Sequence, residues 1–235
     1  MGHGHGHEHG HHQGAGRTVS LEQDVLAGND RLAAQNRAAL ARRGILALNL
    51  MSSPGSGKTT LLVRTLTDLG AAQPISVVEG DQETLLDAER IGATGARVVQ
   101  VNTGAGCHLD AAMLADAVAV LDPPDGSLLL VENVGNLVCP ALFDLGEAAR
   151  VVVMSVTEGA DKPLKYPHMF RTADLVLINK IDLLPYVDFD VASCVDGARR
   201  ARPGVEVIEV SATRGDGLDS WYAWLDQRRT APSRA

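Results

Sequence analysis

The sequence has few aromatic residues, few cysteines and no long apolar run. Only 3% of its 235 residues are aromatic, so a folded core has to be built mainly from Leu, Val, Ile and Ala. No apolar segment approaches the roughly 20 residues of a membrane-spanning helix, and none follows the N-terminus as in a signal peptide. Three cysteines are too few for a disulfide framework, and an odd number leaves one of them without a disulfide partner. Both points favour a reducing compartment. We therefore expect a cytoplasmic protein.

Positive charge is also scarce, because 21 Lys+Arg face 29 Asp+Glu and the formal net charge is −8. Nucleic-acid binding generally needs a basic surface that replaces phosphate counterions, so this balance argues against it. The length and an ordinary hydrophobic content of 45% suit one large α/β domain.

Histidine, in contrast, is concentrated at the N-terminus. Six of the eight histidines lie within the first twelve residues, mostly alternating with glycine: His3, His5, His7, His9, His11 and His12. Residues 1–16 contain almost nothing apolar, so we predict a disordered tail whose imidazoles hold Ni²⁺. An engineered purification tag is the alternative, although such tags are normally uninterrupted histidine runs.

Downstream of the tail, strand-like runs alternate with helical patterns. The capping-box spacing of Ser20 and Gln23 predicts a helix over 17–43, with a candidate bend at Gly28-Asn29. Nearly continuous apolar runs indicate seven strands buried on both faces, at 45–51, 75–81, 97–103, 127–133, 150–156, 174–180 and 205–210. Helical patterns cover 58–69, 82–92, 108–121, 188–201 and 217–228. This alternation predicts an α/β fold, a doubly wound and mostly parallel sheet over 44–228, followed by a disordered tail over 229–235.

The first apolar run leads into a glycine-rich loop, Ser52-Ser-Pro-Gly-Ser-Gly-Lys-Thr-Thr60. Phosphate binding needs backbone N–H groups that turn inward and a helix whose positive end faces the phosphates. A strand–loop–helix context with Gly-Lys-Thr meets this need, although Ser52 stands where the P-loop pattern begins with glycine. Lys58 is expected to reach the β- and γ-phosphates, and Thr59 to ligate Mg²⁺. We assign nucleotide binding to six loop residues: Gly55, Ser56, Gly57, Lys58, Thr59 and Thr60.

The sixth strand ends in Asn179-Lys-Ile-Asp182, which favours guanine as the base. A carboxylate at Asp182 can accept hydrogen bonds from guanine N1–H and the exocyclic amine, a pair that adenine does not present. Asn179 is expected to bond the opposite edge of the base, and the Lys180 stem to cover its ring. Ser211-Ala212, after the seventh strand, resembles the GTPase loop that points a backbone N–H at guanine O6. GTP is therefore preferred over ATP.

Two acidic residues end strands on the phosphate side. Asp81 ends the second run, and Glu132 lies in Glu132-Asn-Val-Gly135, where many GTPases carry Asp-x-x-Gly. Either carboxylate can hold Mg²⁺, and helix capping or turn formation is the alternative for each taken alone. We count both as catalytic together with Lys58. Hydrolysis is expected to be slow, because no water-positioning glutamine is identified.

A Cys-His pair and a separate Cys-Pro pair follow neighbouring strands. Cys107 and His108 come after the third run and Cys139 after the fourth, so the three side chains are expected to converge. Cysteine with histidine suits Zn²⁺ or Ni²⁺, and a symmetric dimer can complete a site of three ligands. The alternative is that these cysteines, like Cys194, are small core residues. Because Cys139 lies four residues after Gly135, loss of the γ-phosphate is expected to change the metal geometry.

Together these segments resemble the hydrogenase nickel-incorporation GTPases of the HypB family. The resemblance spans residues 29–226 and includes Glu79-Gly-Asp-Gln82, Gly106-Cys-His108, Glu132–Pro140, Val156–Pro167 and Asn179–Leu183. It implies a P-loop fold of the SIMIBI class, a GTP-dependent homodimer, and a nickel site at the dimer interface built from Cys107, His108 and Cys139. It also implies delivery of nickel to the [NiFe]-hydrogenase large subunit, with a second nickel-binding accessory protein and a nickel-supplying chaperone as partners.

Two other functions remain open. Urease-accessory GTPases also often carry His-rich tails, but their metal motif is typically Cys-Pro-His, whereas this chain has Cys-His at 107–108 and Cys-Pro at 139–140. The second is a non-enzymatic nickel reservoir in which the nucleotide only gates dimerisation. A P-loop kinase is disfavoured by the guanine motif at 179–182.

Overall fold

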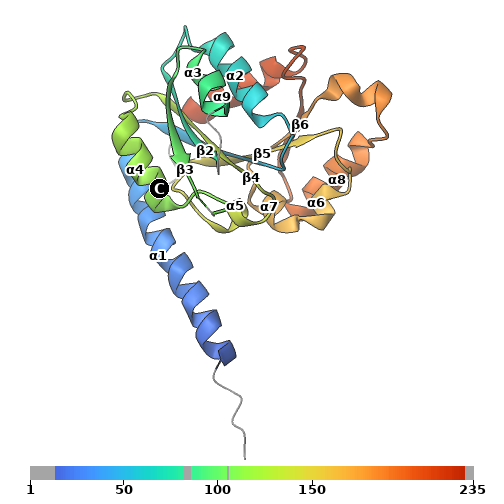
Figure 1. Ribbon diagram of the computed structural model, residues 1–235. Coiled ribbons are helices and arrows are strands. Elements are labelled where there is room, and N and C mark those ends of the chain that lie inside the picture. The colour runs from blue at the N-terminus through green and yellow to red at the C-terminus, as the bar shows by residue number, and fades with distance from the viewer. Residues whose placement is uncertain (1–13, 82–85, 105, 231–235) are drawn as a thin grey trace, which may run out of the picture.

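The structure is a computed structural model that describes residues 14–81, 86–104 and 106–230. A long helix precedes an alternation of strands and helices (Figure 1). The strands are β1 Leu46–Ser52, β2 Ile75–Asp81, β3 Arg97–Asn102, β4 Leu128–Gly135, β5 Ala149–Ser155, β6 Leu175–Asn179 and β7 Glu206–Glu209. The helices are α1 Gly14–Arg42, α2 Lys58–Leu69, α3 Leu86–Gly92, α4 Ala111–Leu121, α5 Cys139–Leu142, α6 Lys162–Lys165, α7 Pro167–Thr172, the 3₁₀ helix η1 Ile181–Tyr186, α8 Val191–Ala201 and α9 Leu218–Thr230.

The described strands form one sheet in the order β3-β2-β4-β1-β5-β6-β7. Every pairing between them is parallel, so the predicted doubly wound α/β fold is confirmed and the sheet is all-parallel in its described part. β1 lies between β4 and β5, and the chain winds outward from it in both directions. Open α/β sheets bind ligands in the crevice outside the strand carboxyl ends at such a reversal. The loop after β1 lies at this position.

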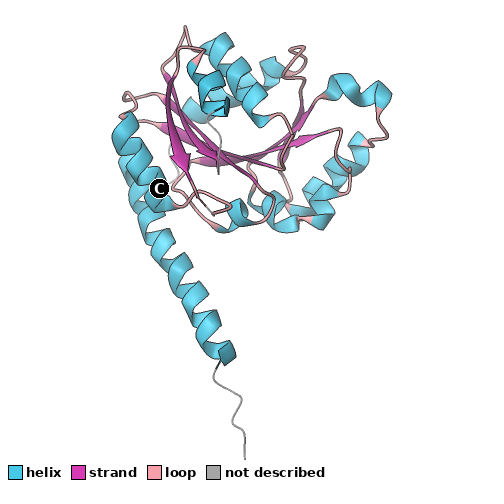
Figure 2. Cartoon of the chain, viewed as in Figure 1, coloured by secondary structure: helices cyan, strands magenta, loops and turns pink. Residues whose placement is uncertain are grey.

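Helices cover both faces of the sheet, which explains the nearly continuous apolar runs (Figure 2). On one face, α2 and α9 pack against alternate residues of the central strands, with Trp221 completely buried. On the other face, α1 and α4 cover β2 and β4, while α7 and α8 cover β5 and β6. This three-layer arrangement leaves the loops at the strand carboxyl ends free to form a site.

Several element boundaries differ from the sequence expectations. α1 begins at Gly14 rather than at residue 17, so its start precedes the capping box and includes three residues of the predicted tail. α1 also continues through the candidate bend, where the Asn29 side chain donates to the Asp144 carbonyl and accepts from the Ala111 N–H. At the other end, α9 extends to Thr230, two residues into the predicted C-terminal tail.

Other helices begin later than predicted because aspartates cap them. Asp110 accepts a hydrogen bond from the Met113 N–H, so α4 begins at Ala111 rather than at residue 108. Asp190 accepts from the Ser193 N–H in the same way at the start of α8. The short helices α5, α6, α7 and η1 were not predicted.

Three predicted segments lie partly or wholly outside the described residues. These are the six tail histidines, the start of the helix predicted over 82–92, and residues 231–235. Among the residues that are described, none of the helices is long and apolar enough to span a membrane.

Candidate nucleotide and metal site

The glycine-rich loop joins β1 to α2 with a backbone that glycine permits. Gly55 and Gly57 have φ values of 76° and 91°, in the left-handed region where other residues are strained. A Cβ added to Gly57 would lie 2.5 Å from Asn179 Nδ2, so the space there also requires glycine. The loop borders a cleft of about 570 Å³, and all six predicted phosphate-loop residues line it: Gly55, Ser56, Gly57, Lys58, Thr59 and Thr60.

Glu132 lines this cleft and contacts two of the predicted phosphate residues. The Thr59 hydroxyl donates to Glu132 Oε1 over 2.7 Å, and the Lys58 ammonium lies 3.1 Å from the same oxygen. Glu132 is 2% exposed, and its Oε2 accepts no hydrogen bond from any described residue. The structure thus brings Lys58, Thr59 and Glu132 together, while their roles in hydrolysis stay predictions.

A second buried glutamate, Glu79, lies beside Glu132 and was not among the predicted site residues. The two face each other in the register of β2 and β4, and Glu79 Oε2 also lacks a hydrogen bond from the described residues. Burial raises the pKa of Glu79 from 4.5 to about 8, and the charge of Glu132 adds to the rise. Alternation along β2 could have identified it, because Glu79 shares a strand face with Asp81.

The oxygen atoms of this cleft fit Mg²⁺. Hard divalent cations prefer carboxylate and hydroxyl oxygens, and Thr59, Glu132 and Asp81 supply these at the strand ends beside the loop. The unpartnered Oε2 atoms of Glu79 and Glu132 are buried acceptors that a cation or its bound water can satisfy. The backbone carbonyl of Asp81 accepts a hydrogen bond from the Thr103 N–H over 3.1 Å, which connects the end of β2 to the residue after β3.

The predicted guanine residues lie together at the ends of β6 and β7. Asp182, in η1, accepts a hydrogen bond of 2.6 Å from the Ser211 hydroxyl, and its second carboxylate oxygen lies 3.8 Å from Nε of the exposed Arg214 side chain. Lys180 has a positive φ of 64° and its ammonium donates to the Gly55 carbonyl over 2.7 Å. The guanine loop is therefore tied directly to the phosphate loop.

Asn179 lies between the phosphate loop and the loop after β7, and its expected bond to the base stays a prediction. Its side chain is 1% exposed and donates to the Ser56 carbonyl over 3.0 Å. Its Oδ1 accepts from the backbone N–H groups of Lys180 and Ala212 over 2.8 and 3.1 Å. Asn179 therefore connects the phosphate loop to the loop after β7, and the Ala212 N–H donates to Asn179 in this structure.

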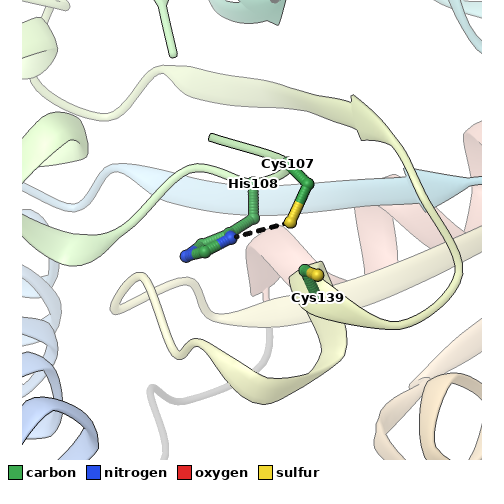
Figure 3. Close-up of side chains that lie close together, drawn as sticks. All are labelled: Cys107, His108 and Cys139. Carbon is green, nitrogen blue, oxygen red and sulfur yellow. Dashed lines mark hydrogen bonds between the residues drawn. The ribbon is translucent and has the colours of Figure 1, made fainter. Parts of the chain in front are cut away.

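Cys107, His108 and Cys139 converge as their positions after neighbouring strands suggested (Figure 3). Their ligand atoms all lie within 4.8 Å of one another, and Cys107 Sγ is 3.5 Å from His108 Nδ1. Phe143, which was not predicted, stacks on the His108 ring with centroids 3.9 Å apart. We call Cys107, His108 and Cys139 the cargo cluster, after the metal that they are predicted to hold. Cys194 instead lies in the core, 3.4 Å from the Met154 sulfur, as expected.

Protonation of the cargo cluster follows from its crowding and burial. A hydrogen bond with the Cys139 thiol raises the pKa of Cys107, and burial raises it further. Burial lowers the pKa of His108, which keeps the imidazole neutral and able to bind a metal. A soft divalent cation entering here therefore meets a ready imidazole and displaces thiol protons.

Asn136 joins the two segments that carry the cargo cluster. Its Oδ1 accepts from the backbone N–H groups of Val138 and Cys139, over 2.8 and 3.4 Å. Its Nδ2 donates to the Cys107 carbonyl over 3.5 Å. Because Asn136 immediately follows Gly135 at the end of β4, the cargo cluster is held by the same strand that carries Glu132.

Comparisons with known proteins agree with this arrangement. A sequence model of the family described as "CobW/HypB/UreG, nucleotide-binding domain" matches residues 46–209. The hydrogenase maturation factor HypB of Azotobacter vinelandii is 58% identical over 219 residues, which cover 93% of this chain and 72% of that protein.

Two solved structures are similar over almost the whole domain. The hydrogenase maturation factor HypB from Archaeoglobus fulgidus is 42% identical with a TM-score of 0.81, covering 87% of this chain and 100% of that one. HypB from Helicobacter pylori, crystallised in complex with nickel, is 37% identical with a TM-score of 0.82, covering 88% of this chain and 98% of that one.

Proposed function

The chain belongs to the CobW/HypB/UreG family, among its HypB hydrogenase maturation factors, and we propose that it is a GTP-hydrolysing nickel carrier for [NiFe]-hydrogenase. The observation that carries this proposal is the cargo cluster, which lies at the end of the strand that also presents Glu132 to the phosphate loop. The nickel complex of the Helicobacter pylori relative supports nickel as the cargo.

The cleft supports GTP hydrolysis through residues with separate tasks. The backbone of the loop and Lys58 bind the phosphates, and Asp182 selects guanine. Thr59, Asp81 and Glu132 hold Mg²⁺, which neutralises phosphate charge when bound. Among the described residues lining the cleft none is a glutamine, so we expect slow intrinsic hydrolysis.

The cargo cluster supports a homodimer that forms with GTP. The described chain supplies three ligands, and a second copy related by symmetry can complete the coordination of Ni²⁺ or Zn²⁺. Val138 and Leu142, on either side of Cys139, are 49% and 51% exposed, which suits an apolar contact around the metal. A second nickel-binding accessory protein and the hydrogenase large subunit are the proposed partners.

The remaining parts of the proposal concern storage and location. The six histidines before α1 present imidazoles that suit Ni²⁺, and we assign them to nickel storage. Cys107, Cys139 and Cys194 are free thiols, which suits the reducing cytoplasm.

Nickel and zinc titrations test the proposal. The protein lacking residues 1–13, which precede α1, is compared with its Cys139→Ala and Cys194→Ala variants, each loaded with GDP or a non-hydrolysable GTP analogue. We expect Cys139→Ala to lose the thiolate-bound nickel and Cys194→Ala to keep it. Equal nickel stoichiometry with and without Cys139 would contradict the assignment of the cargo cluster.

A parallel assay of hydrogenase maturation separates the other functions. A carrier GTPase without residues 1–13 still supports maturation when nickel is ample, whereas a reservoir loses its role with its tail. Maturation of urease instead of hydrogenase would favour a urease-accessory function.

A further inference from the structure

Two consecutive residues at the end of β4 contact the start of α2 on one face and the segment that carries Cys107 and His108 on the other. Successive side chains of a strand point to opposite faces, so Glu132 and Asn133 face opposite sides of the sheet. Glu132 accepts the hydrogen bond from Thr59 beside the phosphate loop. Asn133 is completely buried on the face that α1 and α4 cover, and neither the phosphates nor the cargo contact it directly in the proposed function.

Both ends of the Asn133 amide are used. Its Oδ1 accepts from the Leu109 N–H over 3.1 Å and from the Val134 N–H over 3.0 Å. Leu109 immediately follows His108, so the first of these bonds fixes the path of the segment that carries Cys107 and His108. Leaving a buried N–H without an acceptor costs free energy. The segment that carries Cys107 and His108 is therefore expected to keep its position relative to β4.

The Nδ2 side of Asn133 begins a row of polar side chains that reaches the segment carrying Cys139. Asn133 Nδ2 donates to Asn49 Oδ1 over 3.2 Å, and Asn49 Nδ2 donates to Glu147 Oε1 over 3.3 Å. Arg150 donates to the same Glu147 oxygen and, over 3.4 Å, to the Ala141 carbonyl in α5. Since α5 begins at Cys139, the row connects both segments that supply cargo ligands.

We propose that Asn133 is a positioning residue that sets the spacing of the cargo ligands according to what Glu132 binds. This inference rests on the proposed function and names the residue that couples nucleotide binding to nickel affinity. When the phosphates and Mg²⁺ engage Glu132, the backbone of the next residue moves with it, and the Leu109 N–H follows its acceptor. Coupling between two sites in one protein typically amounts to about 5- to 150-fold in affinity.

The experiment measures nickel affinity with GDP and with a non-hydrolysable GTP analogue in the full chain. Absorption from thiolate-to-nickel charge transfer reports the cargo cluster alone, because histidines of the tail contribute no sulfur ligand. We expect the two nucleotide states of the native protein to differ by at least about fivefold in nickel affinity. In Asn133→Ala this ratio is expected to fall to about one, while nickel still produces the charge-transfer band and GTP still binds.

Two further variants separate positioning from a general loss of stability. Asn133→Asp keeps the acceptor for the Leu109 N–H and loses the donor to Asn49. Because the bond to Leu109 carries the coupling, this variant is expected to keep a ratio clearly above one, which is rescue by a conservative change and also covers a failure of Asn133→Ala to fold. Thr65→Val removes a buried hydroxyl that donates to the Leu61 carbonyl and accepts from Trp221 on the opposite face, and the ratio is expected to be unchanged.

The outcomes distinguish this inference from the proposed function. A native ratio in Asn133→Ala, or a lost ratio in Asn133→Asp, would overturn the role of Asn133 and leave the nickel-carrying GTPase intact. A native protein that binds nickel through thiolates and hydrolyses GTP, but with equal nickel affinity in both states, would also overturn it. Absence of the charge-transfer band or of GTP hydrolysis in the native protein would instead refute the proposed function.

Discussion

Replacing Glu79 with glutamine tests the charge balance inside the nucleotide cleft. Glu79 is 2% exposed, faces Glu132 in the register of β2 and β4, and has a pKa raised to about 8. The unfolded chain releases the Glu79 proton near pH 4.5, whereas the folded protein keeps it until about pH 8. The contribution of Glu79 to the free energy of unfolding should therefore be largest below pH 4.5 and should fall as pH rises to about 8.

The size of this effect follows from the separation between the two pKa values. At about 1.4 kcal/mol per pKa unit, the rise from 4.5 to about 8 corresponds to about 5 kcal/mol for a group isolated from solvent. Water in the open cleft screens part of it, so we expect a loss of about 2 to 4 kcal/mol. Glutamine stays neutral at every pH, and its amide can donate to the unpartnered Glu132 Oε2.

Urea unfolding of the nucleotide-free protein between pH 4.5 and 9 measures the difference. Glu79→Gln should match the native protein at the acidic end and exceed it in stability at pH 8 to 9. Glu89→Gln, an exposed glutamate on α3, is the control and should follow the native curve. Parallel curves for the native protein and Glu79→Gln would refute the reasoning, because Glu79 would then ionise alike in both states.

Three further predictions concern the site. The hydrogen bond to Cys139 raises the pKa of Cys107, so nickel binding has to displace thiol protons. Nickel affinity measured by titration calorimetry should therefore rise between pH 7 and 9, by about tenfold per pH unit for each thiol deprotonated, and a flat profile would contradict this. Gly57→Ala should weaken binding of a fluorescent GDP analogue at least about tenfold, because its Cβ meets a buried asparagine, whereas Gly204→Ala, with similar φ and open space, should not. Asp182→Asn should weaken GTP binding by about 100-fold and favour xanthine nucleotides, which present a carbonyl in place of the guanine amine; unchanged base preference would exclude this role.

The fold could be predicted closely because its signals are local. Continuous β-branched and aliphatic runs identify strands that are buried on both faces, and the helical patterns between them require parallel connections. Helix ends were less accurate, since Asp110 and Asp190 act as caps where an apolar pattern alone suggested an earlier start. Ser20 resembled a cap but lies inside α1.

Residues of the candidate site could be predicted where they belong to local motifs, whereas their contacts with distant segments could not. Lys58, Thr59 and Glu132 belong to motifs whose residue types suffice to suggest phosphate and magnesium chemistry, and the structure places them in contact. The contacts of Asn179 with the Ser56 carbonyl and the Ala212 N–H could not be predicted, because they join segments that are distant in the sequence, and its bond to the base stays a prediction.

Residue chemistry and order along the chain are enough to indicate a phosphate loop, a guanine motif and three soft metal ligands. Which of these groups come into contact depends on the order and register of the strands, and these arise from hydrogen bonds between distant segments. That register places Glu79 opposite Glu132, and the contact of the buried Asn133 with the Leu109 N–H follows from the same packing. Neither relation has a signature in the local pattern, because each joins residues more than twenty positions apart.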